Sequence, residues 1–175
     1  MILATLRELA AHVCPPLWLF GGVAVDFLAG RWTRPHGDID LNALAGDRER
    51  IAADLRALGY DTEDTGWLTH WRQPHTGRAV EIVFLERDAT GEAVLVIPEG
   101  AAIGTPGRHA TVPGYLDPAR WAQLEGVRFR VSHPVGEWQA RRQGSGVIAG
   151  RARDPKLDHD LRVLETVIPE RERLS

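Results

Sequence analysis

The stretch WLFGGVAVDFLAGRWTRPHGDIDL, residues 18–41, constrains the fold of this chain most. An apolar run at residues 17–20 predicts a buried strand, and residues 23–29 predict a short helix that ends at Gly30. Gly21 and Gly22 lie between these two elements, where a backbone without side chains can approach a bound group closely. Backbone amides and the positive end of the helix would point at that group. The sequence therefore predicts an anion cradle at the two glycines.

A pair of acids opens the second predicted strand, residues 38–44. Because side chains alternate along a strand, Asp38 and Asp40 share one face, with Cα atoms about 6.8 Å apart, while Ile39 and Leu41 face the core. Both carboxylates can then reach one hard cation, and Mg²⁺ prefers a couple of such oxygens together with water and phosphate. Acids with this spacing arise by chance roughly three times in a chain of this length, so the glycines nearby carry the interpretation.

Hydrophobic periodicity predicts the remaining elements. Helical spacing is found at residues 3–13, 47–58 (with Asp47 as the N-cap), 134–142 and 156–168. Alternation typical of strands is found at residues 67–72, 78–86, 92–99 and 127–133. Residues 100–120 are predicted to be irregular and residues 144–150 to form a loop. We expect an α+β fold, with a mixed β-sheet, flanking helices and a small C-terminal helical part.

Composition excludes several classes of protein. A formal net charge of -3 argues against a surface that coats nucleic acid, because phosphate neutralisation needs an excess of Lys and Arg. One cysteine, Cys14, excludes an internal disulfide. No apolar run reaches the roughly 18 residues of a membrane helix, and Arg7 and Glu8 interrupt the N-terminal segment. We expect a soluble cytoplasmic protein with no nucleic-acid or membrane partner.

The window around the two glycines resembles the small antibiotic nucleotidyltransferases of the aminoglycoside-2''-adenylyltransferase and lincosamide nucleotidyltransferase type. That group shows a Trp-x-x-Gly-Gly, an Ala-x-Asp, a Gly-Arg-x-x-Arg and a His-x-Asp-h-Asp, matched here by Trp18, Gly21, Gly22, Asp26, Gly30, Arg31, Arg34, His36, Asp38 and Asp40. A weaker likeness extends through VEIVF and PKLDHDLRVL, where Lys156 and Asp160 match a Lys-x-x-x-Asp helix start. The resemblance implies a nucleotidyltransferase fold in a single domain at residues 1–175, with a catalytic core at 1–100 and a C-terminal extension at 101–175.

The resemblance also implies an activity. The protein would be an enzyme, a Mg²⁺-dependent adenylyltransferase that moves AMP from the co-substrate ATP to a hydroxyl of a small antibiotic-like acceptor, such as an aminoglycoside or a lincosamide. The catalytic and metal-binding residues would be Asp38, Asp40 and a third carboxylate on a neighbouring strand, Glu81. The nucleotide-binding residues would be Gly21, Gly22, Arg34 and Lys156.

Two departures from the family pattern bear on the third carboxylate and on the acceptor. The family often has Asp where this chain has Glu81, and the lincosamide enzymes place a His two residues later, where this chain has Val83.

The acidic stretch at residues 61–67, if it lies near the cleft, would attract a polycationic aminoglycoside. Val80, Ile82 and Phe84 would face the core and leave Glu81 on the opposite face of the strand.

Several alternatives remain open from the sequence. Instead of acting in catalysis, Glu81 would form a salt bridge on an edge strand. Instead of binding a metal, Asp158 and Asp160 would stabilise the start of a helix, where acids interact favourably with the positive end of the dipole. Asp26, Arg31 and Arg34 would form a local ion-pair scaffold that holds their loop. At the level of function, the alternatives are an antitoxin-like regulatory protein of the same fold and a noncatalytic nucleotide-binding protein. Apolar residues on the last helix would either close the core or form a homodimer interface.

Overall fold

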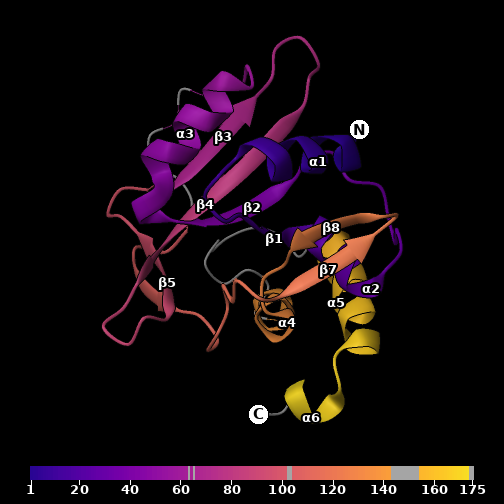
Figure 1. Ribbon diagram of the computed structural model, residues 1–175. Coiled ribbons are helices and arrows are strands. Elements are labelled where there is room, and N and C mark those ends of the chain that lie inside the picture. Colours follow the sequence, from indigo (N-terminus) through magenta and orange to yellow (C-terminus); the bar gives the residue numbers. More distant parts are fainter. Residues whose placement is uncertain (63, 65, 102–103, 143–153, 174–175) are drawn as a thin grey trace.

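The computed structural model describes residues 1–62, 64, 66–101, 104–142 and 154–173, and it has the expected α+β class (Figure 1). The helices are α1 (Ile2–His12), α2 (Gly21–Ala29), the 3-10 turn η1 (Ala45–Asp47), α3 (Arg48–Ala57), α4 (Pro134–Arg142), α5 (Pro155–Val167) and α6 (Glu170–Arg173). The strands are β1 (Trp18–Phe20), β2 (Asp40–Leu44), β3 (Leu68–Arg72), β4 (Ala79–Arg87), β5 (Ala93–Ile97), β6 (Gly107–Ala110), β7 (Trp121–Leu124) and β8 (Val127–Arg130). No helix in the described part of the chain is both long enough and apolar enough to cross a membrane.

The main sheet is mixed and has β4 at its centre. Its strand order is β1-β2-β4-β5-β6, and β3 pairs with β4 as well. The β2–β4 pair is parallel, whereas the other pairs of this sheet are antiparallel. The hairpin β7–β8 forms a second, two-stranded sheet. Val131, directly after β8, makes a parallel bridge with Leu19 of β1, which joins the hairpin to the edge of the main sheet.

One face of the sheet carries the main core. Helices α1 and α3 lie on this face, as Figure 1 shows. Leu41 of β2 and Ile82 of β4 point toward them and are fully buried with Leu6 and Leu55. Burial of the intervening apolar positions leaves every second residue of β2 and β4 on the opposite face. That opposite face holds the polar side chains of the candidate site.

A second cluster joins α2 to the C-terminal helices. Val25 of α2 packs with Val135 and Trp138 of α4 and with Val163 and Leu164 of α5. Val163 and Leu164 of the last long helix therefore close a core within one chain, whereas Val167 is exposed. The homodimer stays a prediction.

The structure differs from the sequence-based expectations in several short elements. Strand β6 lies in the segment predicted to be irregular; it is mostly exposed, so it shows no apolar alternation, and its backbone pairing with β5 defines it. Strand β7 was also not predicted, although Glu125 and Gly126 form its hairpin turn with positive φ angles of 45° and 74°. The second strand begins at Asp40, not at residue 38. Asp47 precedes α3 as expected but makes no side-chain cap hydrogen bond. The loop predicted at residues 144–150 lies outside the described residues.

Candidate active site

The two glycines stand at the junction of β1 and α2, and each is required by a close neighbour. Gly21 has φ +70°, a left-handed conformation that disfavours other residues, and a Cβ built on it would overlap Oδ2 of Asp40. A Cβ on Gly22 would overlap the guanidinium of Arg34 and would lie 2.7 Å from Cε1 of His36. The glycine pair therefore lets the start of α2 approach Asp40 on one side and the loop after α2 on the other.

A row of aligned residues crosses the face of the sheet opposite the main core, beside this turn. The strand register places Phe20 opposite Asp40, Asp40 opposite Glu81, and Glu81 opposite His70. Residues directly opposite one another on neighbouring strands project from the same face. Asp40 and Glu81 are thus neighbours, as the sequence predicted, and Asp38 is exposed just before β2 begins.

Asp40 lies in a strongly negative environment. Burial, followed by the charges of Asp38, Glu81 and Glu137, raises the pKa of Asp40 to about 7, and Arg141 opposes this shift. An acid with such a pKa is only partly ionised near neutral pH. The carboxylates around Asp40 therefore repel one another in the absence of a cation.

The donor chemistry of this face fits a magnesium ion. Within the described residues, no group of three His, Cys, Asp or Glu side chains forms a preassembled metal cluster. Mg²⁺ does not need one, because it keeps several waters and binds through one or two carboxylates plus substrate phosphates. The mutual repulsion at Asp40 is the feature that a divalent cation would relieve. Asp38, Asp40 and Glu81 are the residues that could hold it.

Glu137 of α4 contacts the glycine turn directly, and sequence reasoning missed it. Its buried carboxylate accepts hydrogen bonds from the Gly21 amide (3.1 Å), from Nη1 of Arg141 (2.9 Å) and from the hydroxyl of Tyr115 (2.8 Å). The expectation of a free amide is therefore wrong at Gly21, because Glu137 already accepts its hydrogen bond. The cradle then rests on the amide of Gly22.

The ion pairs continue from Glu137 to the loop after α2. Nη2 of Arg141 lies 3.4 Å from Oδ2 of Asp160, and Arg34 makes a bidentate pair with Asp160 through Nε (2.8 Å) and Nη2 (3.0 Å). Although burial opposes it, the hydrogen bond from Arg34 and the charge of Arg141 hold the pKa of Asp160 below its ordinary value. We call Glu137, Arg141, Asp160 and Arg34 the buried charge chain. The Glu-x-x-x-Arg spacing of Glu137 and Arg141 within the predicted helix was the signal available in the sequence.

The loop after α2 is fixed by Asp26 more than by ion pairs with arginine. The buried Asp26 accepts hydrogen bonds from the backbone and hydroxyl of Thr33, and Nε2 of His36 lies 2.6 Å from its other oxygen. The predicted ion-pair scaffold of Asp26, Arg31 and Arg34 is wrong, because Asp26 bonds Thr33 and His36, whereas Arg34 pairs with Asp160 on a distant helix. The two acids thus anchor opposite sides of the same loop.

The two predicted cationic ligands of the nucleotide lie in different settings. Arg34 is engaged by Asp160 through two of its nitrogens, so a phosphate would have to compete with that pair. Lys156 is exposed in the first turn of α5, one turn before Asp160. A role of either residue in phosphate binding stays a prediction.

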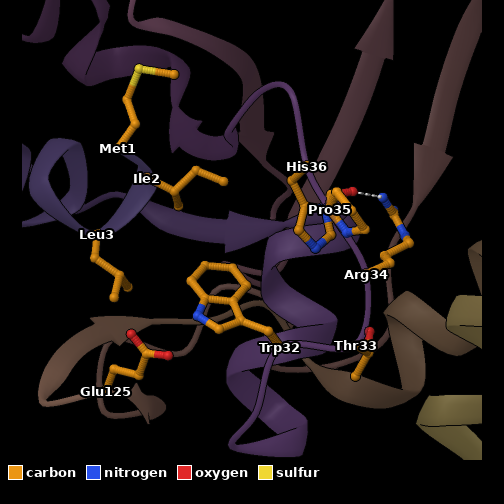
Figure 2. Close-up of a pocket in the computed structure, with 9 residues that line it drawn as sticks. All are labelled: Met1, Ile2, Leu3, Trp32, Thr33, Arg34, Pro35, His36 and Glu125. Atoms are coloured by element: carbon orange, nitrogen blue, oxygen red, sulfur yellow. Dashed lines mark hydrogen bonds between the residues drawn. The ribbon is translucent and has the colours of Figure 1, made fainter.

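A separate cavity of about 720 Å³ is lined by residues of the loop after α2. Figure 2 shows Trp32 near the middle of the view, with Met1 to Leu3 and Glu125 of the β7–β8 turn on its left. Arg34, Pro35 and His36 also line it, but Asp38, Asp40 and Glu81 do not. The carboxylates therefore do not belong to this cavity.

Replacement of Asp40 tests the electrostatics of the carboxylate row. Because the pKa of Asp40 is raised from 3.8 to about 7, the folded protein binds this proton more tightly than the unfolded chain does. The free energy of unfolding should therefore fall as pH rises between about 4 and 7 in chelator-treated protein. We expect Asp40→Asn to be more stable than the wild type by about 4 kcal/mol at pH 8, with the difference vanishing below about pH 4. Urea unfolding across this range measures the difference. Asp47→Asn is the control, and a pH-independent difference at Asp40 would contradict the assignment.

Replacement of Arg141 tests the buried charge chain. Arg141→Met leaves the buried carboxylates of Glu137 and Asp160 without the cation between them, so we expect the free energy of unfolding to fall by about 3 kcal/mol. Arg142→Met, at the exposed neighbouring position, should cost less than about 1 kcal/mol. Urea unfolding at pH 7 compares the two variants. Equal losses would show that the chain is not a stabilising element.

Comparison with known proteins shows what the chain is similar to. A family model described as aminoglycoside-2''-adenylyltransferase matches residues 2–134. A lincosamide resistance protein of Staphylococcus haemolyticus is 34% identical over 64 residues, and this match spans 37% of each of the two chains.

Two solved structures share the fold along nearly the whole chain. The lincosamide antibiotic adenylyltransferase LnuA, solved with lincomycin bound, superposes with a TM-score of 0.67 at 18% identity over 95% of this chain and 96% of that one. ANT(2'')-Ia in complex with adenylyl-2''-tobramycin gives a TM-score of 0.71 at 17% identity over 99% and 92%. At these identities the likeness establishes the nucleotidyltransferase fold. Together with the family match over residues 2–134, it shows that this chain belongs to the aminoglycoside-2''-adenylyltransferase family.

Proposed function

We propose that this protein is an adenylyltransferase, which transfers AMP from ATP to a hydroxyl of a small antibiotic such as an aminoglycoside or a lincosamide. The observation that carries the proposal is the position of the Asp40–Glu81 pair beside the glycine turn at the start of α2. A carboxylate pair able to hold a cation and a helix start able to hold phosphate are the two halves of a triphosphate site. The family match supports the same reaction, and it does not favour the regulatory alternative.

In this proposal each residue acts on a different part of the reaction. Asp38 and Asp40 bind the magnesium ion, which, when bound, neutralises charge on the triphosphate. The Gly22 amide at the start of α2 orients the outer phosphates. Glu81 accepts the proton of the acceptor hydroxyl, and the hydroxyl oxygen then forms a bond to the α-phosphorus. The bond from that phosphorus to the bridging oxygen of the β-phosphate breaks, and pyrophosphate leaves.

The charge around the site favours a cationic acceptor. Asp38, Glu81 and Glu137 surround Asp40, and Asp64, from the acidic stretch, is linked to Glu81 through His70. A concentration of negative charge attracts a polycation and raises its association rate. We therefore infer an aminoglycoside as the acceptor in preference to a lincosamide.

Pyrophosphate release tests the proposed reaction. The purified protein is assayed with each of the four nucleoside triphosphates and Mg²⁺ against a panel of aminoglycosides and lincosamides. We expect release with ATP and an aminoglycoside, and a loss in kcat/KM of at least about 100-fold in Asp40→Ala, because the positioning of the triphosphate depends on this carboxylate. Asp47→Ala, which replaces an acid remote from the sheet face, should retain activity. Full activity of Asp40→Ala would contradict the assignment of the site.

A further inference from the structure

His70 stands directly beside Glu81 and is held from both ends of its ring. It lies opposite Glu81 in the β3–β4 register, and its Nε2 is 2.8 Å from Oε2 of Glu81. Its Nδ1 is 2.8 Å from Oδ2 of Asp64, and the same oxygen accepts a hydrogen bond from the backbone amide of His70. Each ring nitrogen thus faces a carboxylate oxygen, and the plane of the ring is fixed.

Glu81 is a residue that needs such a partner. Its side chain is 32% exposed and longer than that of Asp by one methylene, so it has more rotamers to lose when it adopts a single geometry. Asp40, by contrast, is short and is packed against the glycine turn. A carboxylate that takes part in catalysis must be held within about 0.5 Å of the productive position. The contact with His70 restrains one oxygen of Glu81 and leaves Oε1 for the acceptor hydroxyl.

We propose that His70 is a positioning residue for Glu81 and that Asp64 orients the His70 ring for this task. The inference rests on the proposed function, since it concerns the same carboxylate. His70 acts through Glu81, because its contact with Oε2 holds the Glu81 carboxylate in one orientation.

A purely structural role for this contact makes a different prediction. The side chains of His70 and Asp64 are 58% and 43% exposed. Exposed ion pairs typically contribute little to stability. If the contact is only structural, removing it should change neither the free energy of unfolding nor kcat by much. If the contact positions Glu81, removing it should change the free energy of unfolding little but lower kcat strongly.

The kinetic experiment compares three variants under the conditions of the pyrophosphate assay. His70→Phe keeps a ring but no nitrogen, and it should lower kcat by about 10- to 100-fold while the KM for ATP changes less than about twofold. His70→Gln keeps an amide donor that can reach Glu81, and it should restore kcat to within about fivefold of the wild type. His75→Phe, in the exposed β3–β4 turn, is the matched control and should leave kcat unchanged. Equal kcat values for His70→Phe and the wild type would overturn the proposal.

A second measurement does not depend on turnover. Nitrogen-15 spectra of the histidine rings are recorded for the metal-free and nucleotide-free wild type and for Glu81→Gln. The ring resonances of His70 should shift in the variant, whereas those of His75 should not. Unshifted His70 resonances would overturn the proposal whatever the activity. A different outcome would contradict the proposed function: the His70 resonances shift in Glu81→Gln, but the wild type releases no pyrophosphate with any acceptor. The positioning role would then be lost with the proposed function.

Discussion

The buried charge chain is the constraint on which the rest of the site depends. Glu137 accepts a hydrogen bond from the Gly21 amide. Arg141 and Asp160 connect Glu137 to Arg34 in the loop after α2. Buried charges are tolerated only when each is paired, so these four side chains fix the position of α4 and α5 relative to the glycine turn. The C-terminal half of the chain thereby shapes a turn formed by the N-terminal half. The resulting close approach places Asp40 where only glycine can face it.

The same arrangement produces the repulsion between carboxylates at the candidate site. Asp40 is surrounded by carboxylates in a partly buried setting, and the charge of Arg141 opposes the rise in its pKa. A fold selected for stability alone would not gather acids in this way, because each ionised neighbour makes the next ionisation harder. Sites with strongly shifted pKa values are often functional. The cost is understandable if a cation and a triphosphate complete the site.

The sequence predicted the parts of the site that depend on local pattern. The glycine turn, the face of Asp40 and the position of Glu81 opposite the buried residues of β4 all follow from spacing along one or two elements. The contacts of Glu137 and His70 were not predicted, because they join segments far apart in the chain or depend on strand register. An exposed edge strand such as β6 also escaped, since backbone pairing and not apolar alternation defines it.

A crystal structure of the protein with Mg²⁺ and a nonhydrolysable ATP analogue tests the position of the active site most directly. We expect a metal ion bound by Asp38 and Asp40, with the outer phosphates against the backbone of Gly22 and the α-phosphate on the side of Glu81. A triphosphate bound instead in the cavity around Trp32, with no metal at Asp38 and Asp40, would show that the face of the sheet with Asp40 and Glu81 is not the active site.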